Sequence, residues 1–287
     1  MCDDFDVKRA MLDILREVKR ICNNNNINYF LIGGTLIGAI RHKGYIPWDD
    51  DIDIGMIRED YEKFLNICKE QLNPQFKLST WENETDYPNV YAKIKIKGTT
   101  YIERMTQYTK QDKEIFIDVF PFDNSPQSSV IAKLHGGRIA FYRRLLAIKC
   151  GVDFSGNSSL LKRSINSLLK LICSFFSRSH LYEKNNALCK LYNKTDTKYV
   201  VNACGSYSYM TERVPKELFN SLISTKFECY YFNVPKEYDR YLKHVYGNYM
   251  ELPPENLRNS RHGIMEASLG DYNPISELSK DTITEIM

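Results

Sequence analysis

The sequence of 287 residues predicts an α+β fold in a single domain that carries a basic helical insert. Helical and extended patterns alternate from the N-terminus to about residue 123, whereas the stretch 127–194 is helical and basic. No internal repeat and no low-complexity linker divides the chain. We therefore assign residues 1–287 to one domain, with 127–194 as an insert within it.

The first elements follow from the spacing of apolar residues. Apolar side chains at helical spacing predict an amphipathic helix over residues 6–22, and the asparagines at 23–26 end it. The apolar run "INYFLIG" predicts a buried strand that ends at two glycines. Thr35 is expected to cap a short helix that continues through Arg41. "DIDIGM" alternates acidic and apolar residues as a strand does, and "REDYEKFLNICKEQL" predicts a helix.

The later elements are extended, then helical, then mixed. "FKLST", "VYAKIKIKGTTYIE" and the strongly apolar "EIFIDVFPFD" predict strands. Within the insert, an apolar stripe at helical spacing consists of Leu161, Ile165, Leu168, Ile172 and Phe175. The prolines of "ELPPENLRNSRH" exclude a helix there, and the final dozen residues are expected to form a frayed tail.

The composition is that of a globular protein, with 43% hydrophobic and 26% charged residues. No apolar run reaches the roughly 18 residues that a transmembrane helix requires. The N-terminus is acidic and then amphipathic, unlike a signal peptide. The eight cysteines form no CxxC pair and no cluster with histidine. We therefore expect a cytoplasmic protein with reduced thiols, without a disulfide framework or a structural zinc site.

The net charge of +3 is unevenly distributed along the chain. Residues 131–194 hold twelve Lys or Arg and two acids, a net charge of +10, which leaves about −7 for the remainder. Such a basic block indicates an anionic partner. Because the block includes an amphipathic helix, we weigh peripheral contact with an anionic membrane surface, at the inner face of the cytoplasmic membrane, against simple packing on the rest of the domain.

Four aspartates crowd the segment "PWDDDIDIGM". On a strand, Asp51 and Asp53 point to one face while isoleucines anchor the other face. Parallel carboxylates repel each other unless a cation lies between them, and Mg²⁺ (or Mn²⁺) prefers such oxygen ligands. Asp118, the isolated acid of "IFIDVF", is the expected third metal ligand and catalytic acid, with Asp49 and Asp50 supporting the ligands. The alternatives are a solvated acidic turn for the triplet and a paired structural role for Asp118.

The glycines upstream indicate a phosphate site. Gly33, Gly34 and Thr35 lie between a predicted strand and a short helix, where free backbone N–H groups and the helix N-terminus favour an anion. The basic triplet Arg41-His42-Lys43 adds cations beside this position, and the guanidinium is suited to bidentate contact. An ordinary strand–helix turn and a solvated helix end are the alternatives.

The segment "GGTLIGAIRHKGYIPWDDDIDIGM", with "REDYEKF" behind it, resembles the signature of the LicD family. That family includes bacterial phosphocholine transferases and is related to fukutin and fukutin-related protein. "YAKIKIKGT", "IFIDVFPFD", "FNVPKEYDRYLKHVYGNYMELPPE" and the Arg261-His262 pair continue the resemblance, which is weakest near 127–194. The chain has no cysteine cluster like the zinc-binding insertion of fukutin-related protein, which favours the simpler bacterial type.

The resemblance implies a nucleotidyltransferase-like fold of the polymerase-beta type with a mixed sheet. It also implies Mg²⁺-dependent transfer of a phospho-alcohol, above all phosphocholine, from a CDP-activated donor to a hydroxyl of a cell-surface glycan or lipid-linked sugar precursor, with release of CMP. Ribitol phosphate and glycerol phosphate are alternative groups. Gly33 and Gly34 would then form the phosphate loop, and Asp51, Asp53 and Asp118 would hold the metal.

Further substrate-binding residues are expected in the same motifs. Trp48 precedes the aspartates, Lys93 is expected to stabilise phosphate charge, and His262 belongs to the last resembling segment. Choline requires an aromatic or carboxylate pocket, which the sequence does not locate. The rival functions are nucleotidyl transfer from a nucleoside triphosphate, nucleic-acid binding, which no recognised module supports, and a non-enzymatic sugar-binding role.

Overall fold

A computed structural model of the protein describes residues 4–152, 160–260 and 262–276, without the side chains of 160–166. The predicted tail, at residues 277–287, lies outside this description. The helices are α1 (Asp4–Asn25), α2 (Gly33–Ile37), α3 (Arg58–Gln71), α4 (Ser129–Lys149), α5 (Leu160–Ser174), α6 (Arg178–Lys190), α7 (Tyr209–Glu212) and α8 (Tyr238–Tyr246). The strands are β1 (Phe30–Leu31), β2 (Asp53–Ile57), β3 (Phe76–Ser79), β4 (Ala92–Ile96), β5 (Thr100–Glu103), β6 (Phe116–Ser125), β7 (Tyr199–Val201), β8 (Arg213–Pro215), β9 (Leu222–Phe227), β10 (Tyr230–Pro235) and β11 (Ile264–Ser268).

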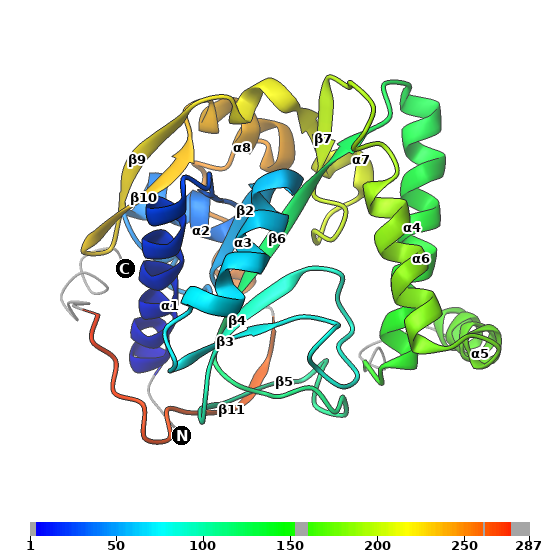
Figure 1. The fold of residues 1–287 in the computed structure, drawn as a ribbon, viewed down its shortest axis with the longest axis horizontal. Coiled ribbons are helices and arrows are strands. Elements are labelled where there is room, and N and C mark those ends of the chain that lie inside the picture. The colour runs from blue at the N-terminus through cyan, green and yellow to red at the C-terminus, as the bar shows by residue number, and fades with distance from the viewer. Residues whose placement is uncertain (1–3, 153–159, 261, 277–287) are drawn as a thin grey trace.

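The central sheet is mixed, and β6 lies in its middle (Figure 1). The strand order is β1-β2-β6-β4-β3, and β7 and β8 continue from the far end of β6. β2 and β6 run parallel, whereas the other pairs of this sheet are antiparallel. Helices and a mixed sheet together agree with the predicted α+β class. The narrower assignment to the polymerase-beta type stays a prediction.

The continuous apolar run of β6 reflects its central place, because neighbouring strands and covering layers exclude water from both faces. Two acids are nevertheless buried in it, and they point to opposite faces of the strand. Asp123 accepts hydrogen bonds of 2.7 Å from both Nε and Nη2 of Arg58 at the start of α3. This bidentate pair fixes α3 to the end of β6, so Asp123 has a structural role. Asp118 lies at the candidate site.

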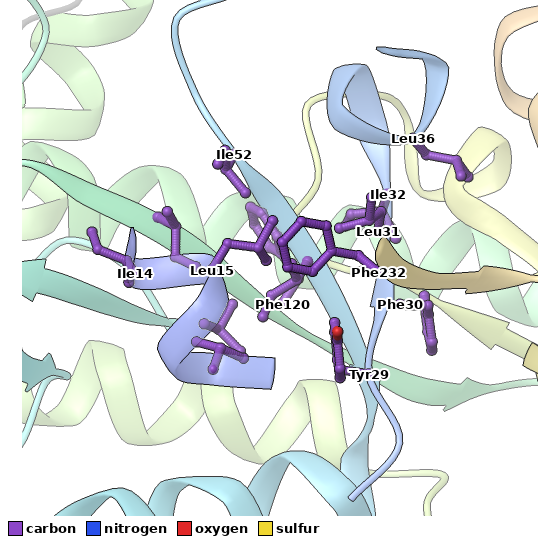
Figure 2. Close-up of a cluster of buried hydrophobic side chains, with 14 of the residues drawn as sticks. Ile14, Leu15, Tyr29, Phe30, Leu31, Ile32, Leu36, Ile52, Phe120 and Phe232 are labelled. Atoms are coloured by element: carbon purple, nitrogen blue, oxygen red, sulfur yellow. The ribbon is translucent and has the colours of Figure 1, made fainter. Parts of the chain in front are cut away.

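The apolar stripe of the N-terminal helix packs on the sheet as predicted. In Figure 1, α1 and α3 lie side by side in front of β2, β6 and β4, and contacts between these elements agree with this view. Figure 2 shows Ile14 and Leu15 of α1 beside Ile52 and Phe120. The strands that carry the aspartates are thereby anchored in the hydrophobic core.

The apolar stripe predicted for the insert is only partly covered by other elements. Leu168 of α5 is 58% exposed and Phe175, directly after α5, is 79% exposed, while Cys173 is buried and Ile172 is half-buried against α4. Leu161 and Ile165 lie outside the described side chains. Because only one side of α5 is covered, packing selects one line of residues and leaves a second apolar line on the surface. α4, α5 and α6 occupy most of 127–194, but the status of this stretch as an insert stays a prediction.

One predicted strand is shorter than expected, and one predicted helix cap was wrong. "INYFLIG" contributes only two residues to the sheet, because the chain turns into α2 directly after the pairing with β2 ends. Thr35 caps no helix, since Ile32 precedes α2 and the Thr35 hydroxyl accepts a hydrogen bond from the Asp53 N–H at 2.9 Å. α2 then continues as a π-helical turn over Gly38–His42. Among the described helices, none is both long and apolar enough to span a membrane.

Candidate active site

A cavity of about 510 Å³ opens at the start of β2 and contains many of the predicted site residues. Its lining includes Gly33, Gly34, Arg41, Trp48, Asp49, Asp51, Asp53 and His262. A cavity of about 620 Å³ between α3, β3 and α6 holds none of the predicted residues. The chemistry predicted from the sequence therefore gathers at the first cavity.

Asp53, Asp118 and Lys93 form a row across three neighbouring strands. Asp53 of β2 is opposite Asp118 of β6 in the parallel register, and Asp118 is opposite Lys93 of β4 in the antiparallel register. Nζ of Lys93 lies 2.8 Å from Oδ1 of Asp118. Asp118 is 8% exposed and does not line the cavity. The predicted phosphate-binding lysine is thus paired with the predicted third acid.

The acids at the cavity repel one another. Burial, followed by repulsion from Asp49, raises the pKa of Asp51 to about 8. Burial, followed by repulsion from Asp51 and Asp118, raises the pKa of Asp53 well above its ordinary value, against a small opposing effect of Lys93. The negative charge at this end of the sheet therefore exceeds what its cations offset.

The glycine pair is required by the aspartates that pack on it. Gly33 has φ +62°, and a Cβ there would lie 2.8 Å from Oδ2 of Asp53. A Cβ at Gly34 would overlap the carboxylate of Asp49. The two glycines thus let carboxylates approach the backbone at the position where the sequence predicts a phosphate.

His262 completes one side of the acidic cluster. Its Nδ1 lies 2.8 Å from Oδ1 of Asp50, and its Nε2 lies 3.7 Å from Oδ2 of Asp51. Burial opposes the charge of His262, but the hydrogen bond to Asp50 and the charge of Asp51 outweigh it and raise the pKa to about 9. Asp50 also accepts a hydrogen bond from Ser260, so it holds His262 at the cavity.

The basic triplet has three different environments. Arg41 lines the cavity, but its Nη1 donates to the carbonyl oxygens of Tyr249 and Glu251 at 2.6 and 3.2 Å. Burial, followed by the charge of Arg41, lowers the pKa of His42 to about 4, so this imidazole is neutral. Lys43 donates to Ile40 at the end of the helical turn. His42, Lys43 and Thr35 do not line the cavity.

Comparison with known proteins identifies the family. Residues 26–156 match the family described as "LicD/FKTN/FKRP, nucleotidyltransferase domain". "Lipopolysaccharide cholinephosphotransferase LicD" of Haemophilus influenzae (strain ATCC 51907 / DSM 11121 / KW20 / Rd) is 32% identical over 260 residues, which are 89% of this chain and 94% of that protein. The chain belongs to the LicD/FKTN/FKRP family. "Ribitol 5-phosphate transferase FKRP" of mouse and of human is 42% identical over 52 residues, 18% of this chain and 10% of FKRP.

The oxygen-rich donor set of this LicD-family chain fits a hard divalent cation. Among the described residues, Asp49, Asp50 and Asp51 offer carboxylate oxygens that lie within 4.8 Å of one another. Asp50 is engaged by His262 and Ser260. Asp53 and Asp118 add carboxylates to the same negative field. Mutually repelling buried carboxylates with only oxygen donors are the environment that Mg²⁺ relieves.

Sequence reasoning missed one whole wall of the cavity. This wall comes from the last third of the chain and includes Asn202, Ser206, Tyr207, Glu212, Tyr241, Tyr246 and Tyr249. Only the family segment "FNVPKEYDRYLKHVYGNYMELPPE", which contains the last three, pointed to any of it. Glu212 follows a short serine- and tyrosine-rich stretch without periodicity, so no sequence pattern singled it out.

Proposed function

We propose that this protein transfers a phospho-alcohol, phosphocholine in the first place, from a CDP-activated donor to a hydroxyl of a cell-surface glycan or lipid-linked sugar precursor, releasing CMP. The observation that carries the proposal is the convergence of Asp51, Asp53 and Asp118 beside one cavity. It occurs in a chain that is 32% identical to a lipopolysaccharide cholinephosphotransferase over most of its length. A nucleotidyltransferase-like core of the polymerase-beta type is part of this proposal.

Asp51 and Asp53 would hold Mg²⁺, or Mn²⁺ in its place, and the charges of Asp49 and Asp118 add to the negative potential there. When bound, the ion would offset the charge of the donor's two phosphates and polarise the phosphorus that is attacked. The charged His262 adds a fixed positive group beside Asp51. Arg41 holds the segment 249–251 against the cavity with its guanidinium.

The reaction is a displacement at the phosphorus that bears the alcohol. The acceptor hydroxyl oxygen forms a bond to this phosphorus, and the bond to the oxygen that bridges to CMP breaks, so that CMP leaves with the bonding electrons. A carboxylate of the acidic cluster accepts the proton of the hydroxyl, and Lys93 orients Asp118 within that cluster through its 2.8 Å ion pair. Gly33 and Gly34 let the carboxylates of Asp53 and Asp49 approach the backbone closely at the edge of the cavity.

The test offers the protein CDP-choline, CDP-ribitol and CDP-glycerol in turn, with lipid-linked glycan and Mg²⁺, and measures CMP. CMP release that depends on the glycan supports the proposal. Release of pyrophosphate from a nucleoside triphosphate, with no CMP from any CDP-alcohol, would replace it with true nucleotidyl transfer, which uses the same acids.

We also propose that the acceptor is met at an anionic membrane surface. The exposed α5 face, defined as Leu168, Leu171 and Phe175, presents apolar side chains on one helix face, and Lys170 is exposed beside it. The surrounding stretch 131–194 carries the net charge of +10.

A further inference from the structure

The wall of the cavity that the sequence did not identify is aromatic. Tyr207, Tyr241 and Tyr246 line it. The rings of Tyr207 and Tyr246 meet edge to face, with centroids 5.3 Å apart and planes at 90°. Perpendicular aromatic rings in the wall of a cavity are typical of the sites that surround a methylated ammonium group.

A buried carboxylate lies in the same wall. Glu212 ends α7, is 6% exposed and lines the cavity. Its Oε1 accepts one hydrogen bond, from the Tyr207 N–H at 3.4 Å, and its side chain packs against Gly205, where a Cβ would overlap it. In the part of the chain that the structure describes, no Lys, Arg or His nitrogen lies within ion-pair distance of Glu212.

The cation that acts on Glu212, Arg143, is hydrogen-bonded to backbone carbonyl groups. Nη1 of Arg143 donates to the carbonyl oxygens of Ala203 and Gly205 at 3.2 and 3.1 Å. Arg143 forms no ion pair with Glu212, although its charge lowers the pKa of this carboxyl group. Burial raises the pKa of Glu212 to about 7. An ionised carboxylate without a paired cation is costly in such a place, so a positively charged ligand would relieve it.

We propose that Glu212, Tyr207 and Tyr246 form the subsite that binds the quaternary ammonium of choline. The inference rests on the proposed function and deepens it, because it names the alcohol. A trimethylammonium group donates no hydrogen bond, so it is recognised by π faces and a negative charge. Ribitol and glycerol carry hydroxyl groups instead, and these require several hydrogen-bond partners.

The proposed subsite and the acidic cluster that would bind the phosphates line the same cavity. Burial raises the pKa of Tyr241 well above its ordinary value, and both Glu212 and Asp53 add to this rise. The half-buried Tyr246 responds to both carboxylates in the same way. Both carboxylates also line the same cavity as these tyrosines, and the short ethylene bridge of choline requires the ammonium site to be near the phosphate site.

The experiment is a calorimetric titration of the full chain with CDP-choline, CDP-glycerol and CMP in the presence of Mg²⁺. We expect CDP-choline to bind at least about tenfold more tightly than CDP-glycerol, the size of a desolvated cation–π contact joined to a carboxylate. Glu212→Gln keeps the shape and removes the charge, and should abolish most of this preference while the affinity for CMP is kept. Tyr207→Leu, at an exposed ring, should reduce the preference several-fold.

Glu228→Gln is the matched control, because Glu228 is also buried, accepts the backbone N–H of Tyr45 at 2.8 Å and packs against a glycine, Gly44, outside the cavity. It should leave the ratio of the two affinities unchanged. Equal binding of CDP-choline and CDP-glycerol to the unaltered protein would overturn the subsite, as would equal weakening of all three nucleotides by Glu212→Gln. Preference for CDP-glycerol overturns the subsite alone, whereas failure of both CDP-alcohols to bind overturns the proposed function.

Discussion

Asp53 of β2 lies directly opposite Asp118 of β6, in the parallel part of the central sheet. Adjacent strands are about 4.8 Å apart, so two carboxylates are carried side by side on rigid backbone. On the other side of Asp118, Lys93 of β4 forms an ion pair with it. Asp53, Asp118 and Lys93 thus form a row of charged side chains across three strands of the sheet.

Asp53→Asn should reduce CMP release by about 10²–10³-fold without lowering the melting temperature. The substitution removes a carboxylate whose pKa is raised by burial and repulsion, so the fold loses an unfavourable charge while the cation loses a ligand. Activity and thermal unfolding are measured on the same preparation. Asp123→Asn is the control, because it breaks the bidentate pair with Arg58 and should cost about 3–5 kcal/mol of stability. Undiminished CMP release by folded Asp53→Asn protein would remove the metal site.

Lys93→Met should lower stability by about 3–5 kcal/mol in the absence of divalent cation, because Asp118 is left buried without its partner. Added Mg²⁺ should restore part of this loss, since it offsets the same negative charge. Chemical denaturation with Mg²⁺ and with chelator measures the difference. Lys97→Met, at an exposed lysine of the β4–β5 turn, should show no such dependence on Mg²⁺. A loss of stability that Mg²⁺ does not change would contradict the idea that Lys93 and Mg²⁺ offset the same negative charge.

Gly34→Ala should reduce activity at least about tenfold, because the new Cβ overlaps the carboxylate of Asp49 and displaces it from the cavity. Gly137→Ala in α4 is the matched control, since nothing lies within 4 Å of the Cβ it would add. That change should leave activity intact and raise stability by about 0.5–1 kcal/mol. Initial rates and melting temperatures are compared. Equal activities of the two variants would show that close approach at Gly34 is not needed.

The affinity for CDP-choline should fall as the pH is lowered through about 7, the raised pKa of Glu212. Below this pH the carboxyl group is protonated and neutral, so it no longer attracts the ammonium. The groups that face Glu212 are Arg143, Tyr207, Tyr241 and Tyr246. The pH dependence of KM for CDP-choline is measured in the unaltered protein and in Glu212→Gln. A dependence that persists in Glu212→Gln would assign it to another group.

The protein should co-sediment with vesicles that contain phosphatidylglycerol and not with vesicles of phosphatidylcholine alone. The exposed α5 face supplies apolar side chains and the surrounding block supplies positive charge. Leu171→Ser combined with Phe175→Ser should reduce binding several-fold. Tyr231→Ser, at an exposed ring of β10, is the control and should bind like the unaltered protein. Equal partitioning into both kinds of vesicle would contradict the contact.

Hydrophobic patterns in the sequence were sufficient to predict several helices and strands. The stripe of α1 predicted its buried face, and the alternation of "DIDI" and the largely apolar run of β6 predicted strands that the structure contains. For the α5 stripe, the sequence left packing and membrane contact open, because periodicity shows which residues share a face and not which face a neighbour covers. Thr35 failed because its competing partner, the Asp53 N–H, is distant in the sequence.

The sequence by itself determined the family, the mixed α and β character, and the acids and glycines of one compact segment, because those residues are close together along the chain and their spacing carries their geometry. Tertiary structure alone decided that Lys93 pairs with Asp118, that Asp50 holds His262, and that Glu212 and its tyrosines line the same cavity as Asp51 and Asp53. These relationships join residues far apart in sequence, and side-chain pairing across them depends on strand register and packing, which no local pattern specifies.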